Sequence, residues 1–315
     1  MTHQEISSYT YIKIPVGSLI HSTEMEEGEG NRFAQVFRFP GLHMRRCIFK
    51  VLSQAAIPNH IAFIMDGNRR YARKEQLTSE GAGHRAGFLA LMAMLKYCGE
   101  LGVKYITIYA FSIDNFHRRP DEVQLLMDLM LEKIELLLKE GHLAGQYGVR
   151  VIFIGNLKLL SEPVRAAAEK AMIATKNNTK ATILVCVAYT STNEIIGAVE
   201  KSCKGKLDIS HAITMKSKEA CDSENKYAGH EWMHQDNVKL VDVEREMFMA
   251  VAPDPDILIR TGENRLSNFL LWQTPNCLLY STNSLWPEIG LRHLVWAVLN
   301  FQRAHSYLEK KKKQP

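Results

Sequence analysis

The stretch that decides the fold runs from His60 to Arg70 and reads His-Ile-Ala-Phe-Ile-Met-Asp-Gly-Asn-Arg-Arg. Its first half is a short apolar run typical of a buried strand, and its second half is a polar loop with groups that bind anions. Similar apolar runs recur along the chain, so the sequence predicts a six-stranded sheet. The predicted strands cover residues 61–65, 105–111, 149–154, 182–188, 257–259 and 277–280.

Amphipathic helices alternate with these strands. Apolar residues recur at helical spacing over 84–101 and 120–139, Ser191 and Glu194 form a capping box that opens another helix, and a last helix covers about 289–307. This alternation is typical of a mainly parallel sheet with helices on both faces. The predicted fold class is therefore α/β: a mainly parallel six-stranded sheet flanked by helices, in one domain over residues 58–308.

The segments outside this alternation differ in composition. We expect residues 1–40 to be a flexible leader, residues 204–240 to be a polar and partly mobile insertion, and residues 309–315 to be a basic tail. Residues 41–57 combine apolar positions at near-helical spacing with Arg45, Arg46 and Lys50. Two interpretations of this amphipathic helix stay open: it lies at a membrane interface, or it packs on the domain.

Composition excludes several classes of protein. A chain of 315 residues with 46% hydrophobic content can bury a large core, which excludes a disordered protein. The net charge of +5 is small and dispersed, so we expect no nucleic-acid partner. The six cysteines form no CxxC pair, which favours free thiols in a reducing compartment. No apolar run approaches the roughly 18 residues that span a bilayer, so we expect a soluble or peripheral protein.

Arginines follow three of the predicted strands at the point where each strand ends. In an open parallel sheet, ligands bind at the carboxyl ends of the strands. Guanidinium groups match phosphate oxygens bidentately, so the cluster predicts a ligand with several negative charges, such as two diphosphates. Surface arginines that pair with nearby acids are the weaker alternative. The cluster comprises Arg69, Arg70, Arg118, Arg260 and Arg265.

Asp66 is the expected ligand of Mg²⁺, because magnesium in phosphate sites takes one or two carboxylates and fills its shell with phosphate oxygens and water. Taken alone, an aspartate after a strand could equally cap a helix. The chain has no P-loop pattern. The segment His230-Glu231-Trp-Met-His234 satisfies the HExxH pattern of zinc proteases, but it lies in the polar insertion without a clear third ligand. A zinc protease is therefore a weak alternative.

Five separated motifs resemble those of the cis-prenyltransferase family, which includes undecaprenyl and dehydrodolichyl diphosphate synthases. The resemblance covers about residues 57–303, and Arg69 with the segment 285–293 is most similar to the eukaryotic dehydrodolichyl and plant rubber-type branch. It implies an apolar tunnel and an enzyme that condenses isopentenyl diphosphate onto an allylic primer such as farnesyl diphosphate. The product would be a long-chain polyprenyl diphosphate, a precursor of dolichol or rubber. The motifs are Asp66–Arg70, Gly83–Gly87, Tyr109–Phe116, Asp256–Gly262 and Arg265–Trp272.

The same resemblance implies roles for individual residues. Asp66 would hold Mg²⁺ close to the primer, and Asn68 would help to orient or deprotonate the incoming unit. The apolar faces of the helices at 84–101 and 120–139 would line the tunnel, unless they are simply core. The allylic diphosphate would be bound by Gly67, Asn68, Arg69, Arg70 and His84; isopentenyl diphosphate by Arg70, Arg118, Arg260, Arg265 and Ser267; and Ser112, Asn115 and Phe116 are further site candidates.

Departures from the family pattern bear on activity and assembly. The segment from Arg260 to Arg265 is one residue shorter than the usual RTSGExR, which could weaken activity. Glu80 and Cys277-Leu278 stand where bacterial enzymes have an arginine and a metal-binding glutamate, and the RxG tail is absent. This pattern implies a heteromeric enzyme at the cytosolic face of the endoplasmic reticulum, in which a Nogo-B-receptor-like subunit supplies the RxG tail. A catalytically silent subunit of such a complex is the alternative.

Overall fold

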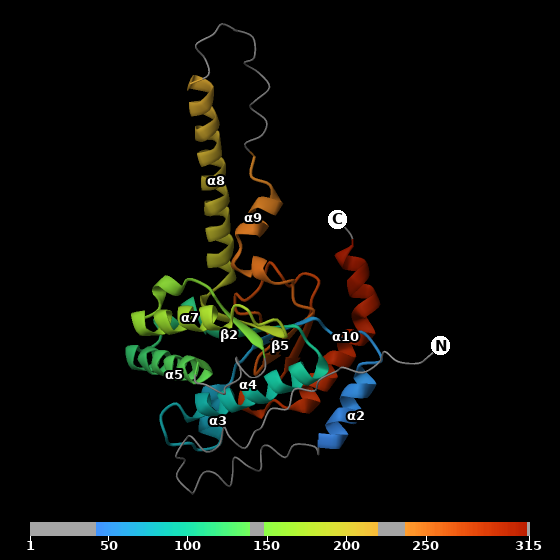
Figure 1. Ribbon diagram of the computed structural model, residues 1–315. Coiled ribbons are helices and arrows are strands. Elements are labelled where there is room, and N and C mark those ends of the chain that lie inside the picture. Colours follow the sequence, from blue (N-terminus) through green and yellow to red (C-terminus); the bar gives the residue numbers. More distant parts are fainter. Residues whose placement is uncertain (1–41, 139–147, 220–236, 314–315) are drawn as a thin grey trace, which may run out of the picture.

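The computed structural model describes residues 42–138, 148–219 and 237–313, and its centre is a six-stranded parallel sheet (Figure 1). The strand order is β3-β4-β2-β1-β5-β6, and all five pairings are parallel. The predicted sheet is confirmed, with each strand close to its expected bounds. The strands are β1 (His60–Ile64), β2 (Tyr105–Ser112), β3 (Val149–Ile154), β4 (Ala181–Tyr189), β5 (Ile257–Thr261) and β6 (Leu278–Thr282).

Helices connect the strands, as the alternating pattern predicts. Short 3-10 turns follow several of the strands and helices, at Ile113–His117, Leu157–Leu159, Phe248–Val251 and Trp286–Glu288. The helices are α2 (Leu42–Leu52), α3 (Asn68–Lys74), α4 (Ala82–Leu101), α5 (Pro120–Leu138), α7 (Glu162–Thr175), α8 (Ser191–Glu219), α9 (Leu240–Glu246) and α10 (Leu291–Lys312). Within these ranges, no helix has both the length and the apolar character needed to cross a bilayer.

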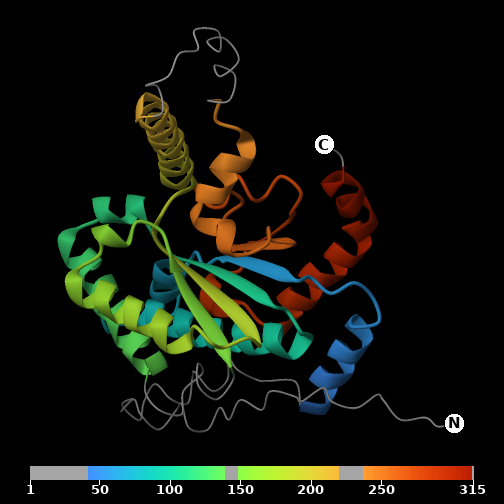
Figure 2. The ribbon, with the colours of Figure 1, turned by 45° about the horizontal axis from the view of Figure 1, so that its top comes forward.

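Both faces of the sheet are covered, because alternate side chains of each strand point to opposite faces. On one face, Ile61 and Phe63 of β1 pack with residues of α4 and α10 in the largest apolar cluster. On the other, Ala62 and Ile64 pack with Phe269 and its neighbours in the 266–277 segment. Along the sheet, α5 packs with α7 near β3, whereas α10 packs on β5 and β6 at the other end of the strand order (Figure 2).

Helix α2 packs on the domain. The side chain of Arg45 is buried, and its Nε donates to Glu100 Oε2 of α4 at 2.6 Å. Phe49 and Leu52 join the main core cluster. Val51 is 71% exposed and does not pack on the domain. These contacts support the interpretation of α2 as a packed helix, while Val51 leaves an apolar side chain on its outer side.

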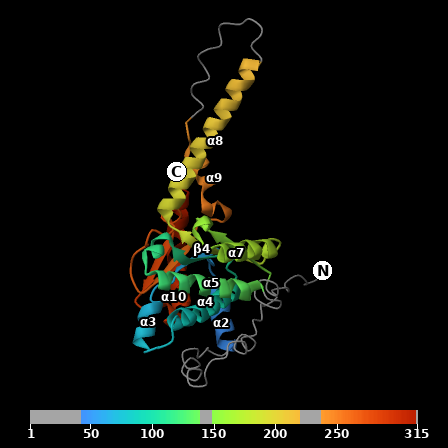
Figure 3. The same ribbon diagram turned by 90° about the vertical axis from the view of Figure 1, so that its left-hand side faces the viewer.

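Helix α8 differs from the expectation of an insertion that begins at residue 204. The helix continues to Glu219 and projects from the body of the molecule (Figure 3), so residues 204–219 are helical. Residues 220–236, which include His230, Glu231 and His234, and the leader at 1–40 lie outside the described residues. The basic segment also begins as helix, because α10 extends to Lys312, whose Nζ lies 2.9 Å from Asp256 Oδ1.

Candidate active site

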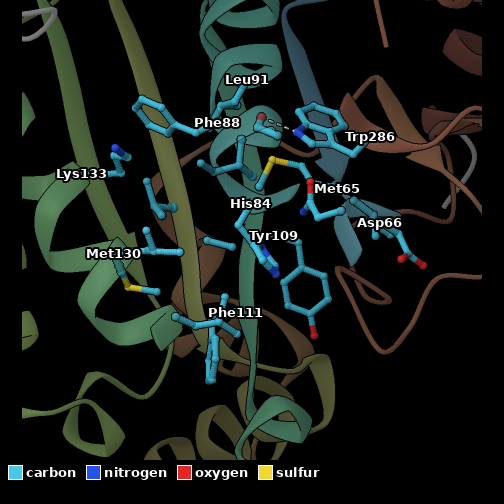
Figure 4. A pocket seen from close by; sticks show the side chains of 18 of the residues that line it. Met65, Asp66, His84, Phe88, Leu91, Tyr109, Phe111, Met130, Lys133 and Trp286 are labelled. Carbon is cyan, nitrogen blue, oxygen red and sulfur yellow. Dashed lines mark hydrogen bonds between the residues drawn. The ribbon is translucent and has the colours of Figure 1, made fainter. Parts of the chain in front are cut away.

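One cavity of about 920 Å³ runs from the carboxyl ends of the strands into the space between α4, α5 and the sheet (Figure 4). Its outer part, here called the polar mouth, carries most of the predicted site residues. Its inner part, here called the apolar tunnel, is lined mainly by aliphatic and aromatic side chains. The polar mouth comprises Asp66, Gly67, Asn68, Arg69, Arg70, His84, Ser112, Asn115, Arg118, Arg260, Glu263, Arg265 and Ser267.

The register of the central strands assembles the polar mouth. Ile64 of β1 lies opposite Arg260 of β5 and opposite Tyr109 of β2, so the segments that follow these strands meet at one edge. Gly67 has φ 114° and directly precedes α3; a Cβ there would lie 2.9 Å from Leu285 Cβ. Only glycine fits both the left-handed backbone and this close approach.

Arg260 is the buried centre of the polar mouth, with a side chain that is 3% exposed. Its Nη2 lies 2.9 Å from Asp66 Oδ2, and its Nη1 donates to Ser267 Oγ at 2.7 Å. Burial lowers the pKa of this guanidinium, while the charge of Asp66 opposes that shift. Arg70 Nη2 also lies 3.3 Å from Asp66 Oδ1. One carboxylate therefore holds two arginines in place.

Glu263 is a member of the cluster to which the sequence analysis assigned no role. Its carboxylate lies 3.7 Å from Arg70 Nη2 and 3.6 Å from Arg260 Nη2, and it accepts from Arg265 Nε at 2.5 Å. The position of Glu263 between Arg260 and Arg265 in the sequence was a signal that could have indicated this role. In the structure, Arg265 lines the cavity despite the shorter segment that precedes it.

A third carboxylate, that of Glu122 in α5, pairs with two other arginines of the polar mouth. Glu122 lies 3.2 Å from Arg69 Nη1 and 2.7 Å from Arg118 Nη1. His84 stands beside this group, and its pKa is lowered to about 4, first by burial and then by the charge of Arg118. The imidazole is therefore neutral at neutral pH, so it can serve as a hydrogen-bonding group but adds no positive charge.

Three buried polar atoms of the polar mouth have no hydrogen-bond partner among the described residues. They are Asn68 Oδ1, Arg70 Nη2 and Arg260 Nε. Arg70 Nη2 lies within ion-pair distance of Asp66, but not in hydrogen-bond geometry. A Cβ on Gly87 would lie 2.1 Å from Asn68 Oδ1, so only glycine leaves room for this amide. Because buried polar groups are normally paired, these atoms are suited to bind a polar ligand.

The structure brings together all but one of the predicted site residues. Phe116 is the exception, because it does not line the cavity. Its ring packs against Phe111 with centroids 4.9 Å apart, in the apolar cluster that includes residues of α5 and α7. Phe116 therefore acts in this structure as a packing residue that supports the 112–118 segment.

The donor set fits a magnesium ion that is shared with phosphate groups. Asp66 presents a partly exposed carboxylate to the cavity, and among the described residues no cluster of three or more histidine, cysteine, aspartate or glutamate side chains forms a metal cage. Mg²⁺ in phosphate sites commonly uses only one or two carboxylates, with phosphate oxygens and water as the other ligands. The site therefore suits a metal that arrives with a diphosphate.

The apolar tunnel is built by one face each of α4 and α5 over the sheet. Not every residue of the predicted helical faces takes part: Cys98 and Leu101 belong to the core. Two cations, Lys96 and Lys133, also line the tunnel; burial lowers the pKa of Lys96, and Lys133 Nζ lies 5.0 Å from the centroid of the Phe88 ring. Tunnel residues include Phe88, Leu91, Met92 and Leu95 of α4, and Leu126, Leu129, Met130, Ile134 and Leu137 of α5.

An arginine-rich mouth that leads into an apolar tunnel defines an enzyme for long apolar diphosphates. The family model described as putative undecaprenyl diphosphate synthase matches residues 64–308, so the chain belongs to this cis-prenyltransferase family. The chain is 58% identical over 287 residues to dehydrodolichyl diphosphate synthase 6 of Arabidopsis thaliana, covering 90% of this chain and 96% of the relative. It is 54% identical over 292 residues to a rubber cis-polyprenyltransferase of Hevea brasiliensis, covering 91% and 99%.

Further comparisons agree with this assignment. The chain is 39% identical over 265 residues to a human protein named as a dehydrodolichyl diphosphate synthase complex subunit, covering 82% of this chain and 72% of the relative. The crystal structure of lavandulyl diphosphate synthase from Lavandula x intermedia with dimethylallyl diphosphate matches with TM-score 0.61 and 28% identity, covering 78% and 95%. The predicted family, its eukaryotic and plant branch, and the transferase activity in cis-prenyl chain elongation are confirmed; the zinc protease and the silent subunit find no support.

Proposed function

We propose that the polar mouth holds the diphosphates of an allylic primer and of isopentenyl diphosphate side by side, while the apolar tunnel receives the growing chain. Asn68, Arg69, Arg70 and His84 bind the primer's diphosphate, with the backbone of Gly67 beside them. The second diphosphate is bound by Arg70, Arg118, Arg260, Arg265 and Ser267, with Ser112 and Asn115 at the rim. The continuity of the two parts in one cavity carries the proposal.

The chemistry follows from where the charges lie. When the allylic C–O bond breaks, negative charge develops on the departing diphosphate, and the fixed guanidinium groups of Arg69 and Arg70 stabilise it. Asn68 Oδ1, which is buried and has no hydrogen-bond partner among the described residues, orients the incoming unit as it forms the new carbon–carbon bond. The proton that this unit loses passes to an oxygen of the departing diphosphate. The apolar wall excludes water, which would otherwise capture the reactive allylic group.

Magnesium is the proposed cofactor, and Asp66 is its proposed ligand in this chain. When bound with the substrate phosphates, Mg²⁺ would neutralise charge on the leaving diphosphate. In addition, Asp66 orients Arg260 and Arg70, to which it is ion-paired.

Transfer of radiolabelled isopentenyl diphosphate onto farnesyl diphosphate tests the function. Asp66→Ala should lower this activity by about 100-fold or more, the usual cost of removing a preorganised charged group. Asp128→Ala removes an exposed carboxylate of α5 outside the cavity and should leave the activity unchanged. No product from the wild-type chain, alone or with its partner subunit, would contradict the proposal.

A second subunit is part of the proposal, because the human relative is named as a complex subunit. We expect a Nogo-B-receptor-like chain to contribute its RxG tail to the polar mouth and to hold the enzyme at the cytosolic face of the endoplasmic reticulum. Coexpression with such a subunit should raise the rate of elongation. An unchanged rate and separate elution of the two chains on size-exclusion chromatography would contradict this part.

The outer side of α10 supports a peripheral association with membranes. Trp296 and Tyr307 are exposed there, and Arg292, Arg303 and Lys310 share the same side of the helix. Aromatic and basic side chains together suit the interface of an anionic bilayer. Phosphatidylcholine vesicles should sediment this chain only when they contain phosphatidylserine, and Arg303→Glu should weaken that binding. Equal sedimentation with both kinds of vesicle would argue against it.

A further inference from the structure

The loop that follows Arg265 has an unusual backbone. Ser267, Asn268 and Leu270 have φ values of 49°, 55° and 48°, in the left-handed region that residues other than glycine rarely adopt. Such conformations persist only where the surroundings hold them. Ser267 lies within this stretch and presents its Oγ to Arg260 at 2.7 Å. The backbone of the loop therefore decides where a hydroxyl of the polar mouth lies.

Asn268 ties the loop to the first turn of α8. Its Oδ1 accepts from Thr192 N and from Thr192 Oγ1, both at 3.1 Å, and its backbone oxygen accepts from Ser191 N at 2.7 Å. In return, Ser191 Oγ accepts from Leu271 N at 2.9 Å. The backbone N–H groups at the start of a helix have no acceptor within the helix. Asn268 supplies acceptors for two of them in α8, and these hydrogen bonds hold the loop in place.

The apolar side of the loop is anchored separately. Phe269 is fully buried and stacks on Tyr109 of β2, with centroids 4.3 Å apart and an interplanar angle of 12°. Tyr109 OH donates to the backbone oxygens of Tyr189 at 3.1 Å and of Ser267 at 3.4 Å. Phe269 thus holds the loop against β2, and the hydrogen bonds of Asn268 hold it against the start of α8.

We propose that Asn268 is a positioning residue for isopentenyl diphosphate: by bonding the first turn of α8, it places Ser267 and Arg265 where they meet the substrate's diphosphate. This inference rests on the proposed function, in which those two residues bind that diphosphate. The start of α8 lies outside the cavity, yet in this proposal it affects the affinity for isopentenyl diphosphate. Ser191 is the partner through which this can be tested, because it is fully buried and does not line the cavity.

The test measures KM for isopentenyl diphosphate and for farnesyl diphosphate separately, together with Tm, in the full-length enzyme. Asn268→Ala should raise KM for isopentenyl diphosphate up to about tenfold, the scale of one lost hydrogen bond, and leave KM for the primer within about twofold. Ser191→Ala should shift the same constant in the same direction. Asn268→Asp keeps the accepting oxygen but adds a negative charge to a residue that lines the cavity, so it should restore Tm more than affinity for isopentenyl diphosphate.

Two further variants separate positioning from general destabilisation and from backbone strain. Gln302→Ala removes an amide that donates to the backbone oxygens of Leu52 and Ala56, and none of these three residues lines the cavity, so it should lower Tm without moving either KM. Asn268→Gly relieves the left-handed backbone but removes the acceptor, so its KM for isopentenyl diphosphate should stay raised. A wild-type KM in Asn268→Gly would overturn the proposal.

Ser267→Ala distinguishes failure of this inference from failure of the proposed function. It should raise KM for isopentenyl diphosphate on its own account. If it does so while Asn268→Ala and Ser191→Ala have wild-type constants, the positioning role is wrong and the diphosphate site stands. If Ser267→Ala has no effect on this KM, the assignment of the diphosphate site is itself wrong, and the positioning role falls with it.

Discussion

The two ends of the cavity are built on opposite principles. In the polar mouth, the arginines are already paired with carboxylates before any substrate arrives: Asp66 and Glu263 pair with Arg70 and Arg260, and Glu122 pairs with Arg118. In the apolar tunnel, most of the lining side chains are aliphatic or aromatic, so they have no groups that form ion pairs. The mouth therefore selects a ligand by charge and geometry, whereas the tunnel selects by volume and exclusion of water.

This difference predicts how each end responds to substitution. A mouth built from ion pairs fails when one member is removed, because the remaining charges are left misplaced in a partly buried site. A tunnel built from apolar surface tolerates exchange of one aliphatic residue for another and responds to changes of volume. Substitutions in the mouth should change rate constants, and those in the tunnel should change product length.

The largest effect is expected from Arg260→Ala. This arginine is buried and holds both Asp66 and Ser267, so its loss should lower kcat/KM by about 100-fold or more. Steady-state transfer of radiolabelled isopentenyl diphosphate measures the change. Arg165→Ala is the matched control, because Arg165 forms its ion pair with Glu162 on the surface of α7, away from the cavity. A loss below fivefold in Arg260→Ala would break the distinction between the two ends.

Leu95→Trp should change the product while leaving the first condensation intact. Leu95 lies on α4 in the tunnel, three turns beyond His84 of the mouth, so a larger ring should block the later additions and shorten the polyprenyl chain. Reversed-phase chromatography of the dephosphorylated products gives the length distribution. Leu89→Trp, on the exposed side of the same helix, should give wild-type lengths. Equal lengths in all three enzymes would show that the tunnel does not receive the chain.

Glu263→Gln should have a smaller effect and should strengthen, not weaken, the binding of diphosphate to the polar mouth. The variant removes a carboxylate that competes with diphosphate for Arg70, Arg260 and Arg265, so inorganic pyrophosphate should inhibit about two- to fivefold more tightly, the range of partly exposed ion pairs. Competitive inhibition constants at low and high salt measure this. Glu309→Gln, which alters a surface pair with Lys312, is the control. Weaker inhibition in Glu263→Gln would mean that this carboxylate organises the arginines.

The smallest effect is expected from the titration of His84. Its pKa is about 4 in the folded protein and about 6.5 when exposed, so the unfolded chain binds the proton first as pH falls. The stability that His84 contributes is complete above pH 6.5 and is lost as pH falls from 6.5 towards 4. Tm of His84→Gln should therefore depend less steeply on pH in that window. NMR titration of the imidazole near pH 6.5 would contradict the buried, neutral state.

Much of the fold and of the mouth could be predicted because both depend on local pattern. Apolar runs followed by turns predicted the strands. Because ligands bind at the carboxyl ends of parallel strands, the sequence also predicted that Asp66, Arg118 and Arg260 share one site. Glu263 was not assigned a role because an acid between two arginines does not reveal which of them it contacts. The helical state of residues 204–219 was not predicted, because the polar composition typical of an insertion is equally compatible with a helix.

The sequence by itself determined the α/β class, the parallel sheet and the chemical character of the polar mouth, because strand periodicity and residue type are local properties of the chain. The tertiary structure alone decided that α2 packs through Arg45, that Phe116 faces the core, and that Asn268 bonds the start of α8. Each of these depends on contacts between segments far apart in the chain. Packing fixes such contacts through shape and hydrogen-bond geometry, which one-dimensional spacing does not encode.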